Sequence, residues 1–330
     1  MKGHAMKLIK LSIAALLLAF PSAAWAQYEG PRVDWPLPRM TNVVGVTYAD
    51  ADANAAFTVL NRVEPEVEIE SNVFILSYTR SQPIFDRTVH WQLQMPIGNV
   101  DTDSNLPIPA GRSFRDGVGD LTFGATVNLI GAPDLPVREA LRYDLDTTVG
   151  LGISVTAPTG TYESDEVLNL GSNQWSARVS VPIIKSLGDW VPGRRMTLEV
   201  KPSVRFFGNN SNSFGETIEQ DPLLALEAHL TRDLTKDAFI SLDYNLIEGG
   251  DQTFTDSSTG MLVEERDGPG AQSLGFTFGY TVNENLSLFV GHHQTIAESS
   301  NPFELRGSLT TVRLTWSWHP VLQRRSDFQD

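Results

Sequence analysis

Eight ionisable residues lie in the middle of segments that otherwise alternate between apolar and small polar side chains. They are Arg178, Glu199, Lys201, Arg205, Glu227, His229, Asp243 and Arg313. Such alternation is typical of a β-strand, whose successive side chains point to opposite faces, so these residues share the polar face. Facing lipid or a dry core, an unpaired charge would cost several kcal/mol. Facing a wet interior, these charges would either set the selectivity of a pore or pair with one another and close it.

Other residues with chemical potential form no complete site in the sequence. His292 and His293 are adjacent, so on a strand they point to opposite faces and do not bind one metal ion together. The chain contains no cysteine, which excludes disulfides and thiolate chemistry. We therefore expect no cofactor, no metal and no enzyme activity. A hydrolase with Ser, His and Asn on neighbouring strands at a lipid-facing surface stays an alternative, although no fixed signature supports it.

The clearest alternating segment is 273–281, in which Leu274, Phe276, Phe278 and Tyr280 share one face and the other face carries only Ser, Gly and Thr. The same pattern predicts about twelve strands along the chain. They lie near residues 41–49, 68–80, 86–97, 118–129, 145–157, 174–184, 195–207, 222–231, 237–247, 273–281, 285–294 and 305–318.

The connections between these strands alternate in length. The long ones are at about 50–66, 98–117, 158–173, 208–221, 248–270 and 295–304, and the short ones at about 81–85, 130–144, 185–194, 232–236 and 282–284. Outer-membrane barrels have long external loops and short periplasmic turns. The long connections are rich in Asp and Glu, and aromatic residues fall near both predicted rims, with Trp316 at one and Trp175 at the other. We predict an all-β, closed, antiparallel, up-and-down transmembrane β-barrel over residues 41–318. A soluble β-sandwich is the alternative fold.

The ends of the chain have other compositions. Residues 1–26 combine early lysines, a ten-residue apolar run from Leu11 to Phe20 and an Ala-Trp-Ala site, which is the pattern of a secretory signal peptide. Residues 27–40 carry several prolines, which predicts an extended leader or a plug. We expect residues 319–330 to form a periplasmic tail. The net charge of −15 makes nucleic acid an unsuitable partner.

Two motifs near the middle of the chain point to a family. Pro158-Thr159-Gly160-Thr161-Tyr162 is followed by Asn169-Leu170-Gly171-Ser172-Asn173-Gln174-Trp175, with 117–120 upstream and 206–210 downstream. In this order they resemble the MetA-pathway of phenol degradation family of bacterial outer-membrane proteins, over roughly residues 40–318. The resemblance implies a transporter of a kind often encoded near genes for the breakdown of aromatic compounds. It supplies no catalytic or binding residues.

The segment 158–175 is the external connection between two predicted strands. We expect Pro158 to end strand pairing, Gly160 to adopt an unusual backbone angle and Asn173 to hydrogen-bond within its own loop. The segment would then either fold into the mouth of the barrel as a constriction or form a rigid hairpin. Both interpretations stay open.

These observations favour a channel in the bacterial outer membrane that passes small solutes, including aromatic or hydrophobic compounds, by passive diffusion. Its expected partners are outer-membrane lipid, lipopolysaccharide, the barrel-assembly machinery and a small-molecule solute. A structural or adhesive barrel with a closed lumen is the second hypothesis, and the hydrolase is the third.

Overall fold

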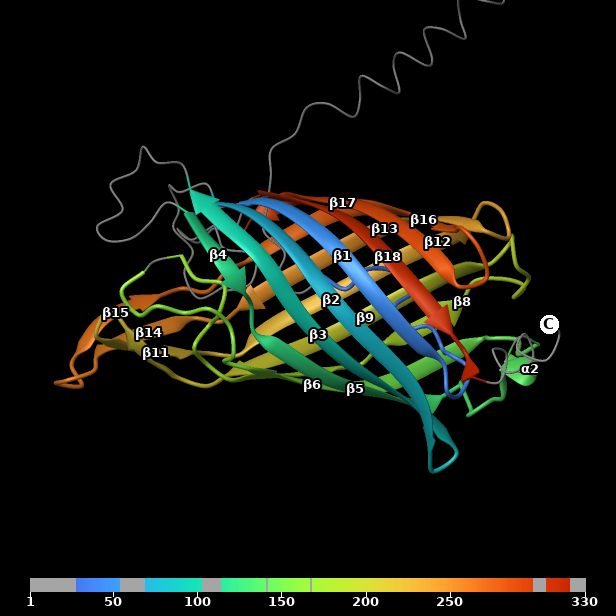
Figure 1. Cartoon of the computed structure of the whole chain (residues 1–330), viewed down its shortest axis with the longest axis horizontal. Coiled ribbons are helices and arrows are strands. Elements are labelled where there is room, and N and C mark those ends of the chain that lie inside the picture. Colours follow the sequence, from blue (N-terminus) through green and yellow to red (C-terminus); the bar gives the residue numbers. More distant parts are fainter. Residues whose placement is uncertain are drawn as a thin grey trace, which may run out of the picture.

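The computed structural model describes residues 28–53, 69–102, 114–140, 142–166, 168–298 and 307–320. They form a closed barrel of twelve antiparallel strands, with a smaller sheet beyond one end (Figure 1). The described part contains no helix that is long and apolar enough to cross a membrane. The predicted signal peptide and most of the predicted tail lie outside the described residues.

The barrel consists of strands whose order around the wall follows their order in the chain. Their bounds are β1 Asn42–Ala53, β2 Ile69–Ile84, β3 Arg87–Thr102, β5 Leu121–Ile130, β6 Thr147–Ala157, β7 Ser176–Ser180, β8 Ile183–Ser186, β9 Met196–Phe207, β12 Leu223–Asp233, β13 Ala238–Gly249, β16 Ala271–Thr281, β17 Leu286–Glu298 and β18 Gly307–Trp318. The wall closes where β1 pairs with β18, from Asn42 opposite Trp318 to Ala53 opposite Gly307. Closure leaves no unpaired strand edge in the wall.

Strands β7 and β8 share one position in the wall, because both pair with β6 on one side and β9 on the other. Pro182 stands between them and has no backbone N–H to donate. The predicted strand 174–184 is therefore interrupted in its middle, and Val181 N donates to Pro202 O across the break at 3.0 Å.

Apolar side chains cover the outside of the barrel. In β16 exposure alternates residue by residue, and Leu274, Phe276 and Phe278 are 40 %, 49 % and 40 % exposed, whereas Ser273 and Thr277 are buried. The aromatic residues Trp175 and Trp316 are also exposed near opposite ends of the wall. An apolar exterior around a closed antiparallel wall is the structure of a transmembrane barrel of the bacterial outer membrane.

The two ends of the barrel differ. One end, called here the short-turn end, carries short turns between strands and a short helix, α2 Val137–Ala140 (Figure 1). The opposite long-loop end carries β4 Phe114–Val118, which pairs with β3, and a separate sheet. That sheet is built in the order β10 Asn210–Ser213, β11 Glu216–Gln220, β14 Gln252–Asp256 and β15 Leu262–Arg266.

In three places the structure adds detail to the predicted division into strands and connections. The connections 208–221 and 248–270 contain strands, and β11 pairs with β14 and joins them in a sheet. The connection 130–144 contains helix α2. The predicted strand 118–129 begins later, at Leu121, because Gly119 donates its N–H to Pro96 O at 2.8 Å and separates β4 from β5.

Candidate functional site in the barrel interior

Residues 28–40, called here the N-terminal segment, lie inside the barrel. Glu29 shows this most directly, because its carboxylate contacts Arg178 of β7 at 2.6 Å and its carbonyl accepts from Arg313 of β18 at 2.9 Å. Strands β7 and β18 are on opposite sides of the wall in the strand order. The segment therefore spans the lumen and is held from both sides.

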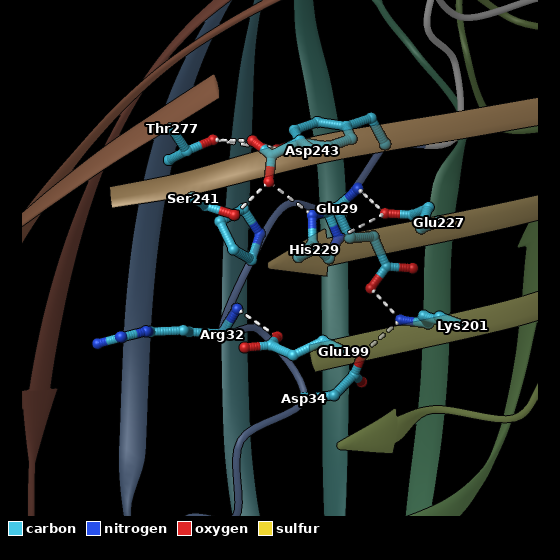
Figure 2. A network of polar contacts seen from close by, with 12 residues as sticks. Glu29, Arg32, Asp34, Glu199, Lys201, Glu227, His229, Ser241, Asp243 and Thr277 are labelled. Atoms are coloured by element: carbon cyan, nitrogen blue, oxygen red, sulfur yellow. Dashed lines mark hydrogen bonds and ion pairs between the residues drawn. The ribbon is translucent and has the colours of Figure 1, made fainter. Parts of the chain in front are cut away.

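The Glu29 carboxylate is the centre of an ion-pair cluster (Figure 2). Its second oxygen accepts from Lys201 Nζ at 2.8 Å, and the same Nζ contacts Asp34 Oδ2 at 2.8 Å. Glu29 also donates its backbone N–H to Glu227 Oε2 at 3.0 Å. Burial by itself would raise the pKa of Glu29, but Lys201 and Arg178 outweigh burial and lower this pKa to about 2. The segment is thus held by a carboxylate that stays ionised at neutral pH.

A second cluster surrounds Asp243, which is fully buried on β13 (Figure 2). Asp243 Oδ1 lies 2.8 Å from His229 Nδ1, and Oδ2 accepts from Thr277 at 2.6 Å and from the Tyr28 hydroxyl at 3.2 Å. The Tyr28 ring also lies 4.0 Å from the ring of His293, centroid to centroid. Tyr28 therefore binds the segment to strands β12, β13, β16 and β17.

A third set of contacts holds the segment toward the short-turn end. Glu199 accepts from Arg32 N and from Trp35 Nε1, both at 2.8 Å. The Arg32 guanidinium contacts Asp233 at 2.7 Å and lies 3.7 Å from the centre of the Phe239 ring. These contacts combine charge, hydrogen bonds and an aromatic face, so the segment has one defined position in the lumen.

The eight residues singled out in the sequence all lie on the inner face of the wall. Six of them, Arg178, Glu199, Lys201, Glu227, His229 and Asp243, are buried, whereas Arg205 and Arg313 are partly exposed to the lumen cavity described below. Sequence reasoning missed their main partners, because Tyr28, Glu29, Arg32 and Asp34 belong to a segment without strand periodicity. The one available signal was the concentration of charges and prolines between residues 27 and 40.

Inside the barrel, the described residues enclose two cavities that adjoin each other. The larger, called here the lumen cavity, has a volume of about 240 Å³ and reaches from Glu29 to Asp120 and Gln174 near the long-loop end. The smaller, of about 50 Å³, runs beside the segment along β3, β5 and β6. Gln92, Gly124 and Ser154 line both cavities, which therefore meet at a wall of small and polar side chains.

The 158–175 connection packs into the long-loop end of the barrel. Asp120 Oδ2 accepts from Ser172 N at 2.7 Å and Asp120 Oδ1 accepts from Gly160 N at 2.8 Å, and Asp120 and Ser172 both line the lumen cavity. Gly160 adopts no unusual backbone angle. It is required because a Cβ there would lie 2.7 Å from Gly171 Cα.

Asn173 also differs from the expectation. Asn173 itself has the positive φ, of 52°, and its side chain donates to Asn210 Oδ1 in β10 at 2.8 Å rather than within its own loop. The two family motifs are therefore joined to β5 and β10, which makes the mouth of the barrel a defined structure.

The two adjacent histidines point to opposite sides of β17. His293 is buried beside Tyr28 in the lumen, whereas His292 Nδ1 lies 3.0 Å from Thr310 Oγ1 and its ring lies 6.2 Å from the lipid-facing ring of Phe276. Within the described residues, Ser241 lies beside the His229–Asp243 pair. Its hydroxyl donates to the Asp243 carboxylate and not to the His229 imidazole. A hydrolytic triad requires the serine on the imidazole.

Comparison with solved structures identifies a barrel of the same fold. The chain is similar to the crystal structure of the COG4313 outer membrane channel from Pseudomonas putida F1, with a TM-score of 0.70 and 20% identity over 88% of this chain and 100% of that chain. Weaker likeness, at a TM-score of 0.39 and 10% identity, is found to the KdgM porin in complex with oligogalacturonate, over 83% of this chain and 99% of that one.

A TodX mutant described as a monoaromatic hydrocarbon channel has a TM-score of 0.42 and 8% identity, over 90% of this chain and 96% of that one. No curated protein matches the sequence. A family model does match, over residues 49–311. That range includes both motifs of the mouth and seven of the eight inward-facing charged residues. On this match the chain belongs to the MetA-pathway of phenol degradation family.

Proposed function

We propose that this protein is an outer-membrane channel that lets small solutes, including aromatic or hydrophobic compounds, cross by passive diffusion. The observation that carries this proposal is the pair of adjoining cavities, of about 240 and 50 Å³, which lie beside the N-terminal segment along one wall. A cavity of roughly 150 Å³ accommodates benzene in another protein, so a single-ring solute fits the larger one. The family description, which concerns phenol degradation, supports an aromatic solute.

We further propose that residues 27–40 form a plug that narrows the lumen without filling it. The contacts of Glu29, Arg32 and Tyr28 with opposite walls support a fixed position, and the narrow cavity beside the plug supports a remaining passage. In this proposal the charged cluster sets which solutes pass. Lipopolysaccharide around the acidic long-loop end and the barrel-assembly machinery are the proposed partners.

The test is transport by the mature chain reconstituted in membranes. Liposome swelling with a panel of sugars, organic acids and single-ring aromatics, together with conductance in planar bilayers, should show permeation that falls with solute size. Impermeable liposomes and an absence of conductance would contradict the proposal.

A structural or adhesive barrel with a closed lumen is the second candidate. It is favoured by one observation, the pairing of interior charges with the segment, since Lys201, Arg178 and Asp233 all lie within 3 Å of a segment residue. A chain that lacks residues 28–38 separates the two candidates. If the natural chain passes nothing and the shortened chain conducts, the natural barrel is closed and the second candidate holds. A channel already conducts with its segment in place.

A further inference from the structure

Arg205 differs from the other charged residues of the interior in what surrounds its guanidinium group. It lies on β9 directly opposite Arg178 of β7, so two like charges face each other on neighbouring strands. Like charges in this position destabilise a sheet unless something compensates them. Arg178 is compensated by Glu29 at 2.6 Å and Glu227 at 3.2 Å.

For Arg205 the described residues supply no carboxylate in direct contact, and Glu29, which pairs with Arg178, acts on it only from a distance. Its Nε is buried without a hydrogen-bond partner among the described residues, as is the Nε of Arg178. A buried guanidinium N–H without an acceptor is unfavourable, and a guanidinium binds a carboxylate through two parallel hydrogen bonds. An anion with the geometry of a carboxylate would supply both the charge and the acceptors for this group.

The surroundings of Arg205 define the rest of such a ligand. Arg205 lines the lumen cavity together with the hydroxyl groups of Thr156 and Ser176, which can donate to further oxygens. Phe207 lies two residues along β9, on the same face and in the same cavity. Side chains two apart on a strand are about 6.6 Å from each other, a spacing comparable to the length of a single-ring acid.

We propose that the lumen cavity binds a small aromatic carboxylate, with its carboxylate on Arg205 and its ring against Phe207. The proposal deepens the channel function proposed above, on which it rests for the transport of the bound acid. The ligand lies on the long-loop side of the N-terminal segment, where a solute from outside the cell arrives first. Arg205 then acts as a selectivity residue that favours anions over neutral compounds of the same shape.

Binding is measured first, in detergent, so that it does not depend on transport. Isothermal titration of the folded mature chain compares benzoate with benzamide and benzylamine, which have the same ring and a neutral or positive head group. Benzoate should bind most tightly, and Arg205→Gln should weaken it about tenfold or more, whereas Arg205→Lys should give an intermediate loss.

The matched control is Arg87→Gln, which removes the same charge from an exposed position at the start of β3. It should leave benzoate binding unchanged. Heat-modifiable mobility on gels checks that each variant is folded. Equal binding of benzoate and benzamide, or a loss in Arg87→Gln as large as in Arg205→Gln, would overturn the site.

Transport is measured next, as the reversal potential in a gradient of potassium benzoate across a planar bilayer. Arg205→Gln should move this potential toward cation preference, and Arg87→Gln should not. Benzoate binding without any conductance would contradict the proposed channel function and support the proposed binding site. Conductance with the same reversal potential in both variants, together with no benzoate binding, would support the channel function and contradict the binding site.

Discussion

At the scale of single residues, Glu29 joins the N-terminal segment to two cations of the wall. Its carboxylate contacts Arg178 and Lys201, which are both buried, so its loss removes one anion from each of them. Removing one partner of a buried ion pair costs about 3 kcal/mol or more, because the remaining charge is neither hydrated nor paired. Asp34 and Glu227 also face these cations and keep part of the compensation.

We expect the docking of the segment to depend on pH through Glu29. The folded pKa of about 2 lies below the ordinary value of 4.5, so this contribution is complete above the ordinary pKa and is lost as the pH falls toward 2. Single-channel conductance should therefore be constant from about pH 7 to pH 5 and rise below about pH 4 as the segment leaves the lumen.

The first test of this prediction is to replace Glu29 by a neutral residue. Glu29→Gln should already have the larger conductance at neutral pH, and its conductance should rise less than that of the natural chain when the pH falls below about 4. Glu264→Gln, which removes a carboxylate from the exposed strand β15, should behave as the natural chain. An acid transition of the same size in Glu29→Gln would assign it to another group.

At the scale of elements, the alternation of apolar and polar residues predicted the barrel strands well. The surroundings of the wall, lipid outside and the lumen inside, fix the residue types on both faces of each strand. The outer face must be apolar for lipid, and the inner face must be polar for the lumen, as in β16, where Phe276 and Phe278 alternate with Thr277. The register then follows, since a shift by one residue would exchange the faces.

The elements outside the membrane have no such constraint, and they were not predictable. Strands β10, β11, β14 and β15 lie in water at the long-loop end, where residues such as Glu219 and Thr253 pair by backbone hydrogen bonds without a pattern in their side chains. The N-terminal segment has no periodicity at all. Its partners are set by three-dimensional contacts such as Glu29 with Arg178, which no local pattern encodes.

The mouth of the barrel depends on one carboxylate that joins two elements. Asp120 accepts hydrogen bonds from Gly160 N and Ser172 N of the 158–175 connection. Asp120→Asn replaces one acceptor oxygen by an amide donor, so we expect this connection to open more readily, by about 1–3 kcal/mol. Hydrogen exchange of the 158–175 amides should become faster, with the exchange of the wall unchanged.

The matched control for the mouth is Asp116→Asn, four residues earlier on β4, where the side chain is exposed. Its exchange pattern should equal that of the natural chain. If both variants exchange alike, the connection is held by its other contacts, such as Asn169 Nδ2 to Glu166 O at 2.9 Å.

At the scale of the whole molecule, the wall and the segment leave two adjoining cavities, and the smaller one lies along β3, β5 and β6. The two cavities meet where Gly124 of β5 pairs with Ser154 of β6, and both residues line both cavities. Glu29 of the segment lines the opposite side of the smaller cavity. Small side chains on the wall at this point therefore leave the space between wall and segment open. We therefore predict that passage through the barrel depends on the size of the side chain at residue 154.

Ser154→Trp should close this passage, because an indole ring occupies more volume than the smaller cavity of about 50 Å³ provides. We expect conductance and liposome swelling to fall several-fold, and heat-modifiable mobility checks that the variant keeps its fold. The adjacent residue gives the control. Ile153 is 52 % exposed on the lipid-facing side of the same strand, so Ile153→Trp adds a comparable ring outside the lumen and should leave conductance as it is. Equal conductance in the two variants would mean that solutes cross the barrel by another path, and the assignment of β3, β5 and β6 as the conducting wall would be wrong.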